Sequence, residues 1–334
     1  MTFVTGDLWH RRQAHKRDEM VAIKYSAQSH GGYTMQKTFH WPIAIVVSAV
    51  LCMAMPLQAS ERISIPDGTH HEGTLDTRNN PITIGNGVEI DGNIRSRNGR
   101  VSVGNNVVAG DVSTRNGSVT LGQGGHFGQV GTRNGSVTVG SGTQAEAIRT
   151  RNGSISVGGD SAIDGELRTR NGSILLERNT RVADDVHTRN GRIVLEPGVE
   201  VAGHVGTRNG DISLDQAHVG RNLQSRGGDL TLRDGSHVGG DVVIELTEAQ
   251  AGRRGGFFGF GGSRIYPEAG DIRILGGSEV HGDVIVKLPA NYDERIPRVE
   301  IDADSRVHGH LRIDERVELV VDGQVDGQVE HISH

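Results

Sequence analysis

The chain has 334 residues and a formal net charge of −6, with 49 glycines but only six Phe, four Tyr and two Trp. So few aromatic side chains argue against a compact two-domain enzyme, because aromatic residues supply much of the buried area in such cores. Intrinsic disorder is also disfavoured, since charged residues make up only 23% of the chain and Val, Ile and Leu recur throughout it.

Residues 35–59 have the pattern of a secretory signal peptide. Lys37 precedes an apolar stretch at residues 42–57, and Ala59 supplies a small residue for cleavage. The apolar stretch is shorter than the roughly 20 residues that a membrane-spanning helix needs. We therefore expect a periplasmic or secreted protein that is cleaved near Ala59, and we expect residues 1–34 to be a mis-called start or a disordered segment.

Removal of residues 1–59 changes the character of the chain. These residues hold the only cysteine, six Lys or Arg and three Asp or Glu, so the remaining chain has a net charge of −9 and a single lysine, Lys287. No disulfide framework is then possible. The acidity argues against nucleic-acid binding.

The tripeptide Arg-Asn-Gly recurs along the middle of the chain. Its arginines are residues 97, 115, 133, 151, 170, 189 and 208, and degenerate copies begin at Arg78 and Arg226. Successive arginines are 18 or 19 residues apart, which is a solenoid period too short for a helix in addition to strands. We predict an all-β fold, a single-stranded right-handed parallel β-helix (β-solenoid) over residues 60–334, with about a dozen coils of 18–19 residues.

Each coil is predicted to contain three short strands. Apolar residues alternate with polar ones after each Gly, as in Val119-Thr120-Leu121, and a second unit of the type Val-x-Gly-x-Val follows, as at residues 108–112 and 163–167. Residues 60–76 are expected to cap the first coil. The segment 317–334 is expected to cap the last coil incompletely, because it still contains coil-like sequence.

The Asn of each Arg-Asn-Gly copy is predicted to lie in a tight turn with positive φ. Stacking in register is expected to align these side chains into an amide ladder, as identical side chains align in cross-β stacks. The residues concerned are Asn98, Asn116, Asn134, Asn152, Asn171, Asn190 and Asn209.

Two insertions, residues 247–269 and 289–297, leave the coil at equivalent points, so we expect them to project from one edge of the solenoid. The first contains a concentration of arginine and aromatic side chains, which indicates either a disordered loop or a contact with a membrane or a partner. These residues are Arg253, Arg254, Phe257, Phe258 and Phe260.

A stripe of eleven arginines is predicted on one face of the solenoid. A threonine precedes most of the repeated arginines and is expected to point inward, which turns the arginine outward. The inward residues are Thr114, Thr132, Thr150, Thr169, Thr188 and Thr207. The arginine stripe comprises Arg95, Arg97, Arg115, Arg133, Arg149, Arg151, Arg168, Arg170, Arg189, Arg208 and Arg226.

Three interpretations of the arginine stripe are open at this point. Its guanidinium groups stack and bond to neighbouring carbonyls with nothing bound, or they bind an anionic envelope polymer through bidentate contacts, or they meet the acidic face of another copy. The last interpretation relies on an acidic row predicted on a different part of the coil. That row comprises Asp111, Glu166, Asp185, Asp241 and Asp283.

No catalytic site, metal site or cofactor is expected. The acidic residues occur singly at coil period rather than clustered as glycoside hydrolysis requires. His218 and His237 occupy equivalent positions in adjacent coils, as do His281 and His308, but two ligands do not make a structural zinc site. A hexapeptide-type acyltransferase or another β-helix carbohydrate-active enzyme is the alternative.

The repeat units resemble those of the bactofilins, which are polymer-forming β-helical proteins of bacteria. The resemblance lies in units such as Val-Gly-Gly-Asp-Val at 238–242 and Val-His-Gly-Asp-Val at 280–284, and it covers most of residues 80–330. It implies a parallel β-helix that joins end to end, here as a divergent exported member. We therefore expect a non-enzymatic, structural or adhesive element of the bacterial envelope. The expected partners are further copies of the chain in a homo-oligomer or filament, an anionic envelope glycan, and a membrane at residues 247–269.

Overall fold

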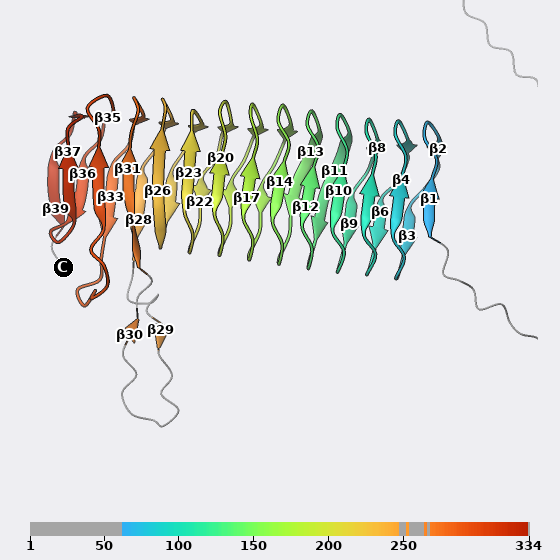
Figure 1. Cartoon of the computed structure of the whole chain (residues 1–334), viewed down its shortest axis with the longest axis horizontal. Coiled ribbons are helices and arrows are strands. Elements are labelled where there is room, and N and C mark those ends of the chain that lie inside the picture. Colours follow the sequence, from blue (N-terminus) through green and yellow to red (C-terminus); the bar gives the residue numbers. More distant parts are fainter. Residues whose placement is uncertain (1–61, 247–251, 254–263, 266–267, 333–334) are drawn as a thin grey trace, which may run out of the picture. The chain divides into compact units, whose positions relative to one another are not determined.

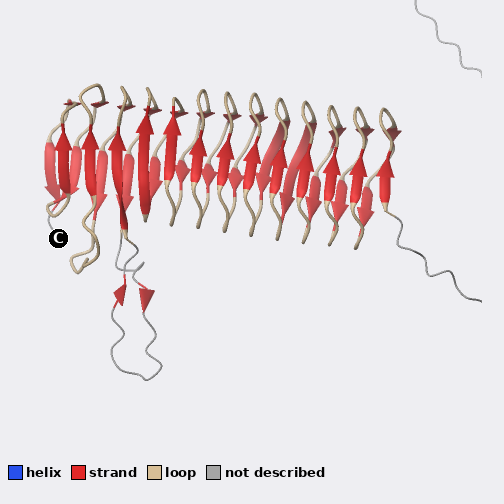
Figure 2. Ribbon diagram, viewed as in Figure 1, coloured by secondary structure: helices blue, strands red, loops and turns tan. Residues whose placement is uncertain are grey.

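The computed structural model describes residues 62–246, 252–253, 264–265 and 268–332. The chain divides into two units, Met1–Ala54 and Met55–His334, and all described residues belong to the second. This unit is a stack of 13 turns in which parallel strands follow one another around each turn (Figure 1). The described residues contain strands, turns and loops but no helix (Figure 2), so the predicted β-solenoid is confirmed.

The strands form three parallel ladders that run along the stack. The first contains β1 (Ile63–Ile65), β4 (Ile82–Ile84), β7 (Val101–Val103), β10 (Val119–Leu121), β12 (Val137–Val139), β14 (Ile155–Val157), β17 (Ile174–Leu176), β20 (Ile193–Leu195), β23 (Ile212–Asp215), β26 (Gly228–Arg233), β31 (Ala269–Ile274), β34 (Arg298–Ile301) and β37 (Glu318–Val321). The second contains β2 (His70–His71), β5 (Glu89–Ile90), β8 (Val108–Ala109), β11 (His126–Thr132), β13 (Gln144–Arg149), β15 (Ala162–Ile163), β18 (Arg181–Val182), β21 (Glu200–Val201), β24 (His218–Val219), β27 (His237–Val238), β32 (Glu279–Val280), β35 (Arg306–Val307) and β38 (Gln324–Val325). The third contains β3 (Leu75–Thr77), β6 (Ile94–Ser96), β9 (Val112–Thr114), the later parts of β11 and β13, β16 (Leu167–Arg168), β19 (Val186–His187), β22 (Val205–Gly206), β25 (Leu223–Ser225), β28 (Val242–Glu245), β33 (Val284–Lys287), β36 (Leu311–Asp314) and β39 (Val329–Ile332).

Alternation of apolar and polar residues fixes which side chains enter the core. In β10, Val119 and Leu121 are buried while Thr120 between them is exposed, and the same pattern recurs in the neighbouring strands β7 and β12. Parallel pairing in register places Val119 beside Val101 and Val137. The core is therefore a set of aliphatic columns, each made of equivalent residues from successive turns.

The mixture of 18- and 19-residue periods has a local cause. In 19-residue turns such as the one containing Ile163 and Leu167, three residues form the corner between the second and third ladders. In the turn of β11 only two residues separate the equivalent Phe127 and Val130, so one strand runs through both ladders. In the turn of β8, this shortening places Ala109 inward and turns Val108, the first residue of the unit at 108–112, outward with 46% exposure.

Positive φ occurs mostly at a different corner from the one predicted. The ladder asparagines do not have positive φ, and at their corner only Gly210 and Gly228 do among the described residues. The corner between the first and second ladders has it repeatedly, as at Asn106, Gly124 and Asn179. The Gly of each Arg-Asn-Gly copy is needed instead for close approach between turns. A Cβ on Gly135 would overlap the carbonyl oxygen of Gly117, and one on Gly117 would overlap that of Gly99.

The threonines of the third ladder are buried, as predicted, and they satisfy this column of glycine carbonyls. Thr132 donates from Oγ1 to the carbonyl oxygen of Gly117 over 2.8 Å, and Thr169 donates to that of Gly153 over the same distance. A buried hydroxyl is thereby paired in each turn, which removes the free-energy penalty of an unsatisfied polar group.

The predicted amide ladder is confirmed. Each asparagine donates from its side-chain nitrogen to the side-chain oxygen of the asparagine one turn earlier, over 2.7–2.8 Å. The chain of hydrogen bonds runs without interruption from Asn79 to Asn209, and it lies beside the column of glycines. Both features hold successive Arg-Asn-Gly corners in register.

The ends and the insertions complete the stack. Residues 63–77 form the first turn rather than a cap, because β1 and β3 pair in register with β4 and β6. The last turn leaves apolar side chains in solvent, with Val321 37% and Val329 47% exposed.

The insertions both follow third-ladder strands, β28 and β33, that pair in register, as expected.

Within the first insertion only the antiparallel pair β29 (Gly252–Arg253) and β30 (Arg264–Ile265) is described. The predicted signal peptide at residues 35–59 and the predicted contact residues Arg254, Phe257, Phe258 and Phe260 lie outside the described residues, as does the side chain of Arg253. No helix in the described part of the chain has the length and hydropathy required to cross a membrane.

Candidate functional site

Two rows of outward side chains run along the third ladder and its following corner. In one turn, Leu167 and Thr169 point into the core, so Arg168 between them and Arg170 after them point outward. Strand pairing aligns Arg168 with Arg149 in the turn before and with His187 in the turn after. The second row consists of the repeated arginines of the corner. The backbone carbonyl of each accepts a hydrogen bond from the backbone N–H of the ladder asparagine one turn later, as Arg151 does from Asn171.

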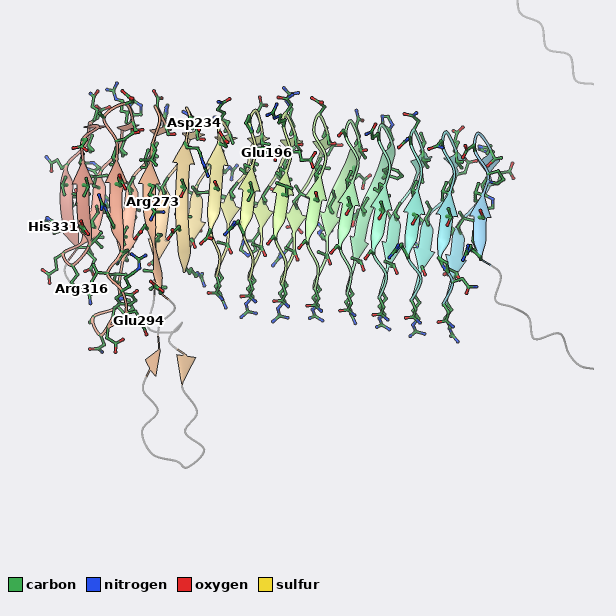
Figure 3. All side chains as sticks on the ribbon, in the orientation of Figure 1. Glu196, Asp234, Arg273, Glu294, Arg316 and His331 are labelled. Carbon is green, nitrogen blue, oxygen red and sulfur yellow. The ribbon has the colours of Figure 1, made fainter. Side chains whose placement is uncertain are left out.

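The two rows border a groove of about 730 Å³, which we call the arginine groove. Figure 3 shows nitrogen-tipped side chains projecting from the same edge of successive turns, opposite the edge that carries Glu196 and Asp234. Seven arginines line the groove, together with threonine, serine, glutamine and histidine side chains. Its lining comprises Arg149, Thr150, Arg151, Arg168, Thr169, Arg170, His187, Arg189, Gly206, Thr207, Arg208, Gln224, Ser225, Arg226, Val243 and Glu245.

The structure therefore brings seven of the eleven predicted stripe residues together. Arg95, Arg97 and Arg115 line a separate hollow of about 370 Å³ that also contains Asp76. Arg133 is exposed but lines neither space.

The end of the groove was missed by sequence reasoning. Val243 follows Gln224 in the first row, and Glu245 takes the place after Arg226 in the second. Alignment of the strand at 242–245 with the preceding coil would have shown that Glu245 ends the row of positive charge.

Most stripe arginines have no side-chain partner among the described residues. Arg149 forms an ion pair with Glu166 over 2.6 Å and donates to Gln129 over 3.2 Å. Among the described residues, the other ten stripe arginines have neither a carboxylate within 4.0 Å nor a side-chain hydrogen bond to the protein. Bonding of these guanidinium groups to neighbouring carbonyls, which was one interpretation of the stripe, is thus not found in this part of the chain.

The unpaired charges repel one another. Neighbouring turns lie about 4.8 Å apart, so adjacent unit charges repel by roughly 0.9 kcal/mol per pair in water before salt screening. The pKa of His187, which lies in the first row beside Arg168, is lowered, first by loss of water around its ring and then by the positive charge of Arg168. The groove therefore has a field that favours anions and disfavours a further cation.

The acidic row is engaged within its own stack. Asp111, Asp185, Asp241 and Asp283 each accept a backbone N–H of the next turn, over 2.7–2.9 Å. Glu166 is the partner of Arg149. These carboxylates stabilise the corner between the second and third ladders, so they are poorly placed to receive the arginines of another copy.

A second polar cluster lies on the second ladder near the C-terminal end of the stack. His218 and His237 stack with ring centroids 4.7 Å apart, and His281 and His308 lie 4.6 Å apart, so both predicted pairs form. The structure also joins the pairs, because the rings of His237 and His281 are 4.4 Å apart. The pKa of His237 is lowered, mainly by burial and then by the neighbouring His218 and His281.

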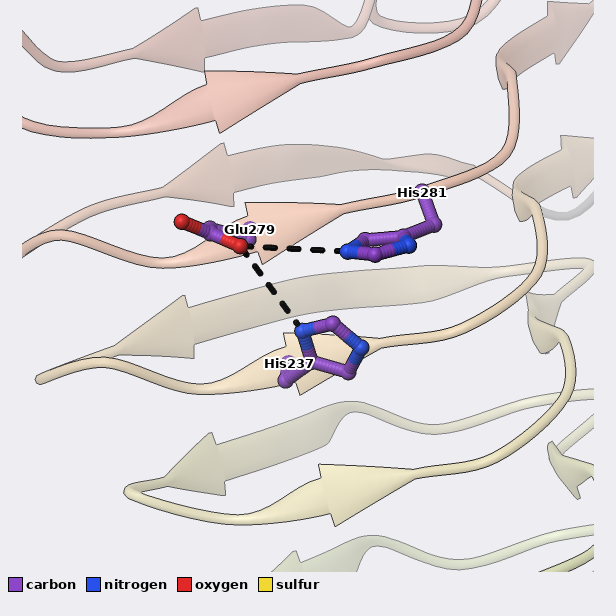
Figure 4. Close-up of side chains that lie close together, drawn as sticks. All are labelled: His237, Glu279 and His281. Atoms are coloured by element: carbon purple, nitrogen blue, oxygen red, sulfur yellow. Dashed lines mark ion pairs between the residues drawn. The ribbon is translucent and has the colours of Figure 1, made fainter.

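Glu279 is the residue of this cluster that sequence reasoning missed. Its Oε2 atom lies 4.0 Å from His237 Nδ1 and 3.8 Å from His281 Nε2 (Figure 4), and it is also 3.9 Å from His308 Nε2. The signal was the alternation in Glu279-Val280-His281, where the inward Val280 turns both polar residues outward.

Comparison with protein-family models, curated protein sequences and solved structures gives no significant match.

Proposed function

We propose that this chain is a non-enzymatic, exported β-solenoid that binds an anionic polysaccharide of the bacterial envelope along the arginine groove. The observation that carries the proposal is the convergence of seven arginines on one groove, only one of which has a carboxylate partner among the described residues. Arginine presents a planar set of donors that matches carboxylate and phosphate oxygens.

The form of the groove favours a polymer over a small anion. Its arginines come from successive turns of one parallel stack, so the positive charge repeats along the stack at about 4.8 Å. A chain that carries an anionic group at regular intervals engages several arginines at once, and each contact after the first is intramolecular.

The lining also favours a polysaccharide over single-stranded nucleic acid. Among the described residues, no Phe, Tyr or Trp lines the groove, whereas proteins that bind single strands commonly stack bases on aromatic rings. The exposed side-chain amide of Gln224 offers hydrogen bonds that suit sugar hydroxyls.

The proposal is tested by replacing three unpaired groove arginines, Arg151→Gln, Arg170→Gln and Arg189→Gln, in one variant. Exposed ion pairs contribute about 0.5 kcal/mol each, so three lost contacts weaken binding roughly tenfold. Binding is measured by calorimetry with polygalacturonate at low and high salt, and uncharged dextran serves as the reference polymer. We expect binding of polygalacturonate alone, weaker at high salt.

The matched control carries the same change in net charge away from the groove. Its substitutions are Arg178→Gln, Arg181→Gln and Arg233→Gln, which lie outside the groove lining. Equal loss of binding in both variants would show that net charge rather than the groove is responsible, and the proposal would be abandoned.

A second function, end-to-end self-assembly, is supported by the exposed last turn. Val321 and Val329 are exposed there, and among the described residues the strands of the first and last turns pair on one side only. Open strand edges with apolar side chains pair readily with another copy. The bactofilin-like repeat units support the same proposal.

Sedimentation velocity at low and high salt tests this assembly. End-to-end species should persist at high salt and should shift to monomer in Val329→Asp. Val108→Asp is the control, because Val108 has a similar exposure but lies in the third turn, inside the stack. A monomer under all conditions would rule assembly out.

A further inference from the structure

The histidine cluster on the second ladder lies apart from the arginine groove and has no role in the proposed function. His237 belongs to β27, Glu279 to β32, and His281 and His308 directly follow β32 and β35. These three strands are consecutive in the ladder. Register places His237 beside Glu279, and Val280 beside Val307, so the cluster spans three turns.

The cluster has the geometry of a metal site. One ligand atom from each of His237, Glu279 and His281 lies within 4.8 Å of the other two. The Glu279 Oε2 atom is 3.8–4.0 Å from a nitrogen of His237, His281 and His308. Ligands of a tetrahedral zinc ion at about 2.0–2.1 Å are roughly 3.4 Å apart, so small side-chain rotations close the set. The side chains are 29–50% exposed, which leaves both access for an ion and room to rotate.

An independent observation points to His308 as a ligand. Its Nδ1 atom lies 2.9 Å from Asp326 Oδ2. Arg306 donates to both oxygens of Asp326, over 3.0 and 2.9 Å, so the Asp326 carboxylate is held as an acceptor and His308 Nδ1 is the donor. The other nitrogen, Nε2, then carries the lone pair and faces Glu279. A carboxylate that orients a histidine in this way is the usual support of a metal-binding imidazole.

We propose that His237 Nδ1, Glu279 Oε2, His281 Nε2 and His308 Nε2 bind one divalent transition-metal ion of the zinc class. Three imidazoles and one carboxylate are borderline ligands that suit Zn²⁺, whereas Ca²⁺ and Mg²⁺ require oxygen ligands. Asp326 is a positioning residue that orients His308.

The ion would tie together the turns between which both insertions leave the stack. The first insertion begins after β28, between His237 and Glu279, and the second begins after β33, between His281 and His308. A ligand set that spans both interruptions stabilises the C-terminal turns, because binding to the folded state alone shifts the unfolding equilibrium.

The experiment measures Zn²⁺ binding to the whole purified chain after chelator treatment, by equilibrium dialysis with elemental analysis. The site variant is Glu279→Gln with His281→Ala, and the control is His126→Ala, an exposed histidine on the same ladder many turns away. We expect the control to bind Zn²⁺ as the parent does and the site variant to bind one ion fewer per chain. Asp326→Asn should weaken this ion about tenfold or more.

Two further measurements keep the result specific. Bound Co²⁺ should show the intense visible absorption of tetrahedral coordination in the parent and lose it in the site variant. His70→Ala tests the other cluster of potential ligands among the described residues, His70, Glu89 and Asp91, whose side chains are all exposed and which offers one imidazole. Loss of the ion in His70→Ala with retention in the site variant would overturn the proposal, as would equal stoichiometry in the parent and the folded site variant.

Discussion

The side-chain nitrogen of Asn134 donates a hydrogen bond to the side-chain oxygen of Asn116, one turn earlier, over 2.8 Å. Asn152 donates in the same way to Asn134 over 2.7 Å. Each internal asparagine of the ladder is thus both donor and acceptor, and its replacement removes two hydrogen bonds at once.

We expect Asn134→Ala to lower the free energy of unfolding by about 1–2 kcal/mol, since an intramolecular hydrogen bond contributes about 0.5–1.5 kcal/mol. The measurement is the midpoint of urea unfolding. Gln123→Ala is the control, because Gln123 is exposed and its side chain forms no hydrogen bond with the described residues. Equal midpoints for the two variants would mean that the ladder contributes nothing to stability.

Gly135→Ala should lower the free energy of unfolding more than Gly206→Ala does. The new methyl group would overlap the backbone carbonyl of Gly117, which cannot rotate away, and overpacking typically costs about 1–3 kcal/mol. In Gly206→Ala the new group meets the movable ring of His187 at 3.3 Å, so we expect a change within about 0.5 kcal/mol. Thermal unfolding of both variants provides the comparison, and an equally stable Gly135→Ala would contradict the close-packing argument.

Protonation of His187 should be linked to anion binding in the arginine groove. Its pKa is lowered from 6.5, first by burial and then by Arg168, while a bound anion adds an opposing negative charge that raises the pKa. Affinity for polygalacturonate should therefore increase as the pH falls from 7 towards 5. His187→Gln should remove most of this increase.

The same lowered pKa has the opposite consequence for stability without a ligand. The unfolded chain takes up a proton on His187 at a higher pH than the folded chain does. The free energy of unfolding is therefore unaffected by His187 above pH 6.5, and it decreases as the pH falls from 6.5 through the lower pKa of the folded state. The other charges that act on the ring are Arg226, which also lowers the pKa, and Asp185 and Glu166, which raise it. Urea unfolding of the parent and His187→Gln at pH 8 and pH 5 tests this sign.

Arg316 should anchor the second insertion. It donates to the carbonyl oxygens of Pro289 over 2.9 Å and Tyr292 over 3.3 Å, and it is paired with the buried Asp314. We expect Arg316→Met to increase hydrogen exchange and protease cleavage within residues 289–297 while the first ten turns stay protected. Arg312→Met is the control, because its exposed side chain contacts carboxylates elsewhere.

The sequence predicted the features that repeat at fixed spacing. Alternation around Thr120 and the period of Arg-Asn-Gly were sufficient for the ladders, the inward threonines and the asparagine ladder, because each depends only on equivalent positions in adjacent turns. The turn geometry at Asn-Gly was predicted incorrectly. Glycine serves both positive φ and close backbone approach, and only the coordinates separate the two uses.

Features that depend on irregular spacing could not be predicted from the sequence repeat. Val108 faces outward because one residue is missing from the following corner, and the period alone does not reveal which corner is shortened. Glu279 joins His237 across an insertion, so their adjacency in the ladder is hidden in the linear sequence. The groove was predicted as a stripe, but its end at Glu245 required the strand register.

Because each Arg-Asn-Gly turn contributes one corner arginine and pairs only with the turns beside it, the proposed binding surface is modular. Duplication of a single Arg-Asn-Gly turn would extend the groove by about 4.8 Å and add one guanidinium without changing any existing side chain. In this proposal, the number of Arg-Asn-Gly turns sets the length of polymer that contacts the groove. A gain or loss of turns during evolution would then change the avidity.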